Sequence, residues 1–253
     1  MLKTLRILFH QGRQSIPDLT RAVVPGIFRG RPLITRAVVD ETALADLCPT
    51  KAIGKSPVSI DLGKCTFCGE CAFAFPDKIS FTRDYRLATN ERNRLIIFEG
   101  EDQPVEINPK GIRREISKYF SGSLKLRQVS AGGDNSCELE LNACGNVNFD
   151  MGRFGIEFVA SPRHADGIVI TGPITTNMAG PLEICYNAVP DPKIIILVGT
   201  DAISMGIFAG SAALDRSFLA KYKIDLFVPG NPVHPLTFIN GVLELIKKRK
   251  EKD

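Results

Sequence analysis

The chain has 253 residues, of which 44% are hydrophobic and 24% are charged, a balance typical of a globular protein with one large domain or two small ones. The net charge of +4, without an arginine-rich arm interleaved with aromatic residues, argues against a nucleic-acid partner. Neither a bilayer-spanning apolar stretch nor a secretory signal is recognisable. We therefore expect a cytoplasmic protein, in which cysteines serve as metal ligands or free thiols rather than disulfides.

Residues 1–36 are expected to form an N-terminal extension. Its first part has the pattern of a short basic amphipathic segment, which we expect to pack on a partner subunit or on the body of the protein, with contact to a membrane surface as the alternative. The extension ends in the run VVPGIFRGRPLI, which Pro and Gly punctuate. The residues that carry the amphipathic pattern are Leu2, Leu5, Ile7, Leu8 and Phe9, among Lys3, Arg6 and Arg13.

Residues 37–85 contain four of the seven cysteines. Cys65, Cys68 and Cys71 follow a C-x2-C-x2-C spacing, which lets one tight loop place three thiolates around a cubane iron–sulfur cluster. Gly69 permits the sharp backbone turn that this spacing requires. Further upstream, Cys48 is followed by Pro49, the Cys-Pro pair with which such a motif ends in bacterial ferredoxins.

This region resembles the two-cluster bacterial ferredoxins, in which the last cysteine of each motif ligates the other cluster. By that spacing, one cluster would need ligands at Val38, Glu41, Leu44 and Phe75, none of which is a suitable ligand. The other would need Cys48, Cys65, Cys68 and Cys71, and all four are present. The resemblance thus implies a ferredoxin-like module with one 4Fe-4S cluster held by these four cysteines. A zinc site on the same thiolates is the alternative, disfavoured because zinc sites seldom take three cysteines at this spacing.

Residues 86–123 are expected to form a linker with two short strands, in LIIFEG and PVEI, and a helix in GIRREISKYF. From 124 to 253, short aliphatic strands alternate with helix-compatible stretches, which predicts a parallel sheet with crossover helices. The expected strands are 124–129, 156–160, 167–171, 193–199 and 223–228, and the expected helices are 137–144, 175–188 and 234–253, the last ending in Lys247, Lys248, Arg249 and Lys250.

The C-terminal part resembles the small electron-transfer subunit of membrane-associated [NiFe] hydrogenases and the related twenty-kilodalton subunit of proton-pumping NADH dehydrogenase. This resemblance implies a flavodoxin-like domain, so the expected fold class is α/β, with an α+β ferredoxin-like module ahead of a flavodoxin-like parallel sheet. The blocks that carry the resemblance are SCELE (136–140), FD (149–150), RFGI (153–156), ASPRHAD (160–166), TGPIT (171–175), PDPK (190–193), VG (198–199), GIF (206–208) and VPG (228–230).

In that family, cysteines of C-x-x-C-E, G-x-C-A and P-G-C-P runs hold a relay cluster. The matching positions here are Asp134, Cys137, Asp201 and Asn231, so three of the four thiolates are missing. Because iron–sulfur clusters require thiolates, we expect this domain to keep the family fold without its cluster. A site rebuilt from Cys137, Cys144 and Cys185 and a divalent metal held by Asp134, Glu138 and Asp201 are less favoured alternatives. His234 is expected to be a surface or capping residue.

The resemblances imply an iron–sulfur electron-transfer subunit of a membrane-associated, hydrogenase-like oxidoreductase complex, with no catalytic residue of its own. Its partners would be a hydrogenase-like large subunit and membrane-embedded subunits, through which it attaches peripherally to the membrane, and a soluble ferredoxin as a further candidate. The alternative is an architectural, assembly or regulatory subunit that has lost its relay cluster. A free-standing enzyme ranks last, because no set of residues assigns roles to a mechanism.

Overall fold

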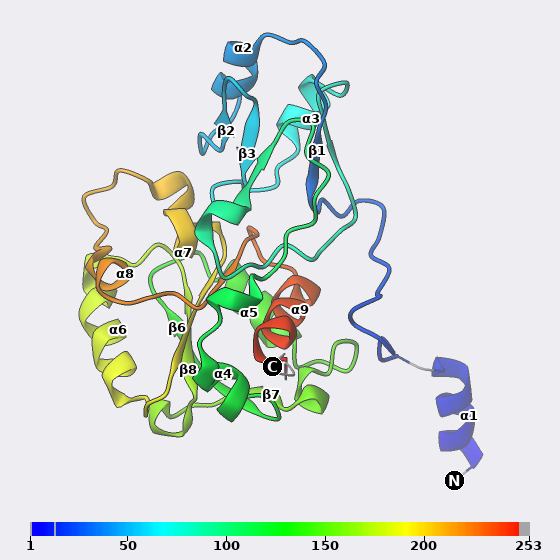
Figure 1. The fold of residues 1–253 in the computed structure, drawn as a ribbon. Coiled ribbons are helices and arrows are strands. Elements are labelled where there is room, and N and C mark those ends of the chain that lie inside the picture. Colours follow the sequence, from blue (N-terminus) through cyan, green and yellow to red (C-terminus); the bar gives the residue numbers. More distant parts are fainter. Residues whose placement is uncertain (1, 13, 248–253) are drawn as a thin grey trace.

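The computed structural model describes residues 2–12 and 14–247. Figure 1 shows a cysteine-containing module at the top, an α/β domain below it and an N-terminal helix that lies apart from both. The hydrophobic core falls into two clusters of buried side chains, one around helix α9 (Pro235–Ile246) and one that continues from the α/β domain into the module.

The α/β domain contains a five-stranded parallel sheet in the order β10-β9-β8-β6-β7. Counted from β6, this is the 2-1-3-4-5 order of flavodoxin-like sheets. The central strands are buried along their whole length, which explains their continuous aliphatic sequences. The predicted mixed α/β class and all five predicted strands are therefore confirmed. The strands are β6 (Leu124–Ser130), β7 (Ile156–Phe158), β8 (Gly167–Thr171), β9 (Ile194–Val198) and β10 (Leu226–Val228).

Helices surround this sheet, and α9 is the most deeply buried of them because most of its side chains are apolar. Asn240 on α9 donates to the carbonyl oxygen of Leu19 at 2.9 Å, which holds the N-terminal extension on the domain. The cations expected at the helix end beyond Lys247 lie outside the described residues. The other helices are α4 (Arg114–Tyr119), α5 (Ser136–Ala143), α6 (Thr176–Ala188), α7 (Thr200–Ser204) and α8 (Ser217–Lys221), with 3-10 turns at Met151–Phe154, Pro162–His164 and Gly206–Phe208.

The module is built from two strand–helix–strand units. The outer strands β1 and β4 pair antiparallel, and so do the inner strands β2 and β3. The second unit therefore repeats the elements of the first and runs antiparallel to it. The first unit consists of β1 (Pro32–Ile34), α2 (Glu41–Asp46) and β2 (Ile53–Gly54), and the second of β3 (Ser59–Asp61), α3 (Glu70–Ala74) and β4 (Ile79–Phe81).

The segment 86–123 differs from the prediction in two respects. The first predicted strand forms as β5 (Ile96–Phe98), after a 3-10 turn at Arg92–Leu95, but it pairs with β3 and so extends the sheet of the module. The strand predicted at 104–107 is wrong: Pro104 lacks the N–H that a ladder needs, and Val105 is buried by packing instead. The helix predicted at 111–120 does form, over a shorter range, as α4, and a 3-10 turn (Pro109–Gly111) precedes it.

The predicted basic amphipathic segment forms helix α1 (Leu2–Gln11), and none of its residues is buried. Leu2 is 83% exposed and Phe9 is 85% exposed, so α1 does not pack on the body of the protein. Within the described part of the chain, α1 and every other helix is too short or too polar to cross a bilayer.

Candidate functional site

The loop that carries three of the predicted ligands begins in a turn held by Asp61. Its backbone carbonyl accepts from the Cys65 N–H at 2.9 Å, and its carboxylate accepts from the Gly63 N–H at 2.9 Å. Arg92 donates two hydrogen bonds to the same carboxylate, at 2.8 and 2.7 Å. These hydrogen bonds hold the start of the cysteine loop in place at the end of β3.

The four predicted cysteine ligands lie close enough for their charges to affect one another's pKa, although no three of them are placed to hold a metal ion. Burial, followed by the negative charges of Cys71, Cys48 and Cys68, raises the pKa of Cys65 to about 12. Burial and the charges of Cys68 and Cys48 likewise raise the pKa of Cys71 to about 11. Such mutual effects require neighbouring sulfurs. Cys65 is buried, Cys48 and Cys71 are half-buried, and Cys68 is exposed, so the group reaches from the core to the surface.

Backbone N–H groups already point at two of these sulfurs. The N–H of Ala52 donates to Sγ of Cys48, and that of Phe67 donates to Sγ of Cys65, both at 3.3 Å. To reach this geometry Phe67 adopts a left-handed backbone (φ 55°), a conformation that costs a bulky residue roughly 1–3 kcal/mol. Strain of this kind persists only where the surrounding structure enforces it.

The four positions of the missing ferredoxin cluster do not converge on a site. Leu44 is fully buried in the core, and Phe75 packs against the same core. Glu41 accepts hydrogen bonds from the backbone and hydroxyl of Ser56, whereas Val38 is fully exposed. Packing and hydrogen bonding therefore account for three of these four side chains, and the fourth is exposed.

The remnant relay positions lie at the carboxyl edge of the parallel sheet, where ligands bind in such folds. Asp134 follows β6, Asp201 follows β9 in α7, and Asn231 follows β10. Cys137, on the first turn of α5, is buried against Gly199, where an added Cβ would come within 2.6 Å of its sulfur. These positions therefore share the carboxyl edge of the sheet.

Three carboxylates, those of Asp134, Glu138 and Asp201, crowd this edge. Burial, then the charges of Asp134 and Glu138, raise the pKa of Asp201 to about 6. The Oδ1 atom of Asp201 is buried and, among the described residues, has no hydrogen-bond partner. Asp134 accepts from the N–H and hydroxyl of Ser136, at 3.0 and 2.6 Å, and this hydrogen bonding lowers its pKa. This edge is therefore acidic, with one buried carboxylate oxygen that has no hydrogen-bond partner among the described residues.

We expect Asp201→Asn to stabilise the protein by about 1 kcal/mol at pH 7.5, a value reduced for solvent screening because Asp201 is only half-buried. The folded pKa lies above the unfolded value of 3.8, so folding is favoured by protonation and stability falls as pH rises toward 6. The free energy of unfolding, measured at pH 7.5 and pH 4.5, should therefore show the gain mainly at the higher pH. Asp134→Asn is the control and should bring no gain in the free energy of unfolding. An equal effect of Asp201→Asn at both pH values would contradict the raised pKa of Asp201.

The remaining cysteines are divided between the two core clusters. Cys144 is fully buried, its thiol donates to the carbonyl of Glu140 at 3.4 Å, and burial raises its pKa to about 12. Cys185 packs against a different core cluster from Cys137 and Cys144. Among residues 2–12 and 14–247, no set of three or more Cys, His, Asp or Glu side chains is placed to hold a metal ion, and this includes the acidic edge and the four cysteines of the module.

No sequence motif predicted the contact between the cysteine module and the α/β domain. The hydroxyl of Thr200, next to Asp201, is buried and lies 2.8 Å from the carbonyl oxygen of Cys65 and 3.3 Å from that of Gly230. Thr89 and Phe227 exchange backbone hydrogen bonds of 3.0 and 2.8 Å at the edge of β10. The cysteine loop is thereby docked directly on the remnant relay edge.

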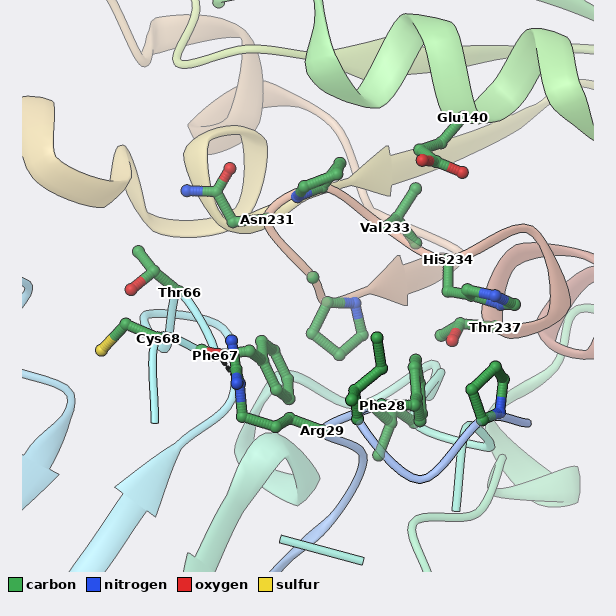
Figure 2. Close-up of a pocket in the computed structure, with 16 residues that line it drawn as sticks. Phe28, Arg29, Thr66, Phe67, Cys68, Glu140, Asn231, Val233, His234 and Thr237 are labelled. Atoms are coloured by element: carbon green, nitrogen blue, oxygen red, sulfur yellow. Dashed lines mark hydrogen bonds between the residues drawn. The ribbon is translucent and has the colours of Figure 1, made fainter. Parts of the chain in front are cut away.

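A cavity of about 560 Å³ lies beside this junction, between the cysteine loop and the loop after β10. Figure 2 shows Cys68 and Arg29 on one side and Asn231 and His234 on the other. His234 caps α9, because its Nδ1 accepts from the backbone N–H of Leu236 at 3.2 Å, and burial lowers its pKa. The prediction of a capping histidine is confirmed.

Known proteins match the C-terminal part of this arrangement. Residues 135–245 match the family model of the NADH ubiquinone oxidoreductase 20 kDa subunit. The probable membrane-bound hydrogenase subunit mbhJ of Pyrococcus furiosus is 34% identical over 134 residues, which cover 53% of this chain and 80% of that protein. The chain belongs to this family. The predicted relationship to hydrogenase and NADH dehydrogenase subunits is thus confirmed, whereas the family match does not extend to the cysteine module.

Other members of the family match over a smaller share of their length. An NADH-quinone oxidoreductase subunit of Bacteroides thetaiotaomicron is 39% identical over 45% of this chain and 58% of its own. Formate hydrogenlyase subunit 7 of Escherichia coli is 35% identical over 51% of each chain. A chain of the membrane-bound sulfane sulfur reductase, an archaeal respiratory membrane complex, is 26% identical over 52% of this chain and 73% of that one, with a TM-score of 0.45.

Proposed function

We propose that this chain is an iron–sulfur electron-transfer subunit of a membrane-associated, hydrogenase-like complex related to NADH dehydrogenase. The names of its relatives support membership of such a complex, since they are subunits of a membrane-bound hydrogenase, an NADH-quinone oxidoreductase and formate hydrogenlyase. On this proposal its partners are a hydrogenase-like large subunit and membrane-embedded subunits, which hold it at the cytoplasmic face of the membrane.

The observation that supports the proposal is the C-x2-C-x2-C spacing of Cys65, Cys68 and Cys71, together with the electrostatic influence of Cys48 on two of these thiols. Four thiolates are the ligand set of a 4Fe-4S cluster, which would supply one-electron chemistry to the subunit. The backbone donors to Cys48 and Cys65 fit the same group, because N–H bonds to the ligand sulfurs stabilise the negative charge there. The two mirrored strand–helix–strand units support a ferredoxin-like origin of the module.

The two ends of this site face different surroundings. Cys68 is exposed, so an external electron donor such as a soluble ferredoxin could approach at this corner of the module. Cys65 is buried, and its carbonyl group contacts Thr200 at the edge of the C-terminal domain. Electrons entering at Cys68 would thus be delivered toward the remnant relay edge, where the large subunit of the family would bind.

The test is the content of iron and acid-labile sulfide in anaerobically purified protein, together with electron paramagnetic resonance after reduction. About four irons and four sulfides per chain, with one uncoupled signal, are expected for a single cubane cluster. Zinc without sulfide would establish the alternative metal site and overturn the proposal. About eight irons with two interacting signals would show that the C-terminal domain holds a cluster too.

An architectural, assembly or regulatory role is the second candidate, and the replacement of three relay thiolates by Asp134, Asp201 and Asn231 favours it. In that role the cluster would be structural or redox-sensing, and electrons would not cross to the large subunit. Reduction of the purified partner complex by an electron donor, with and without this subunit, separates the two candidates. Equal rates would favour the architectural role.

A further inference from the structure

Arg29 is the one residue of the N-terminal extension whose side chain forms a described hydrogen bond to the cysteine loop. Its Nε donates to the carbonyl oxygen of Phe67 at 2.5 Å. Its side chain also covers Gly69: a Cβ added there would lie 3.1 Å from Cδ and 3.3 Å from Nε of Arg29. Both positions have a left-handed backbone, with φ of 55° at Phe67 and 85° at Gly69. Arg29 therefore braces the loop at its two left-handed positions, on either side of Cys68.

The position of Arg29 also brings a positive charge to the exposed corner of the site. The cavity beside the domain junction and a second hollow on the far side of the loop share Arg29 and Cys68 in their linings. The Arg29 bond is solvent-exposed, and its side chain makes no ion pair within the described residues. Arginine stays protonated at all working pH values, so this charge is permanent.

We propose that Arg29 is a positioning residue that holds the Cys65–Cys71 loop in its ligating conformation and raises the reduction potential of the cluster. This inference rests on the proposed cluster. Reduction adds one negative charge to a group that four thiolates already make negative, so a nearby guanidinium favours the reduced state. The bond to Phe67 fixes the distance at which that charge acts.

The experiment is a redox titration of the whole chain, followed by electron paramagnetic resonance, for wild type, Arg29→Gln, Arg29→Lys and Arg21→Gln. Arg29→Gln should lower the reduced-to-oxidised ratio at a given potential about tenfold, a shift of about 59 mV for one electron. Arg29→Lys keeps the charge and should stay within about twofold of wild type. Arg21→Gln is the matched control and should not shift the reduction potential. Arg21 is 87% exposed, pairs only with Asp18 among the described residues and lines a different hollow.

The outcomes separate this inference from the proposed function. Absence of iron from the wild-type protein would overturn the cluster itself. An iron-loaded wild type with an unshifted Arg29→Gln potential would overturn only the role of Arg29. If Arg29→Gln takes up no iron, the rate at which a chelator removes iron from Arg29→Lys is measured instead. Iron loss several-fold faster than from wild type and from Arg21→Gln supports the bracing role. Iron loss at the wild-type rate overturns it.

Discussion

Cys68→Ser is expected to reduce the iron content from about four atoms per chain to well under one, because a cubane cluster needs four thiolates and a hydroxyl is a poor substitute. Cys68 is exposed and its sulfur forms no described hydrogen bond, so the substitution leaves the protein packing intact. The loss of iron can then be ascribed to the missing ligand. Iron and acid-labile sulfide, measured on protein purified without oxygen, check this expectation.

Cys185→Ser and Cys144→Ser are the controls for this experiment. Cys185 is half-buried on α6, and Cys144 is buried beneath α5, so neither belongs to the group around Cys65. Both variants should retain the wild-type iron content, although Cys144→Ser should be less stable because it places a hydroxyl in an apolar core. Iron loss in Cys144→Ser would instead point to a ligand set in the C-terminal domain.

The sequence predicted the parts of this protein that depend on local pattern. The buried strands β8 and β9 have continuous aliphatic sequences, which identify them without any knowledge of the fold. The remnant relay edge was placed correctly because its positions follow strands whose carboxyl ends share one side of the sheet.

Contacts between distant segments could not be predicted in the same way. The Thr200 hydroxyl meets a carbonyl 135 residues away, and Arg29 meets one 38 residues away. Neither residue belongs to a motif, since any threonine or arginine is an ordinary polar residue until the chain is folded. The strand predicted at 104–107 does not form, because Pro104 lacks the N–H that a ladder needs and no described strand pairs with this segment.

A buried ion pair lies beside the positions at which the ferredoxin resemblance would place a second cluster. Lys78 is only 2% exposed, and its ammonium group donates to the carbonyl of Ala37 at 2.9 Å and to the carboxylate of Glu99 at 2.5 Å. Ala37 precedes Val38, the first of the positions at which a second cluster would have been ligated. A buried ion pair thus holds the segment around Ala37 in place.

Glu99→Leu should therefore destabilise the protein by about 3 kcal/mol, because it leaves the Lys78 ammonium buried without its counter-charge. The double variant with Lys78→Met should recover much of that loss, since apolar side chains can replace a buried pair at little cost. Arg86→Met, which breaks the more exposed pair with Asp84, should cost less than about 1 kcal/mol. Anaerobic urea unfolding followed by circular dichroism measures all three. If Glu99→Leu proves as mild as Arg86→Met, the loop is held by packing around Leu44 alone, and the ion pair has no structural role.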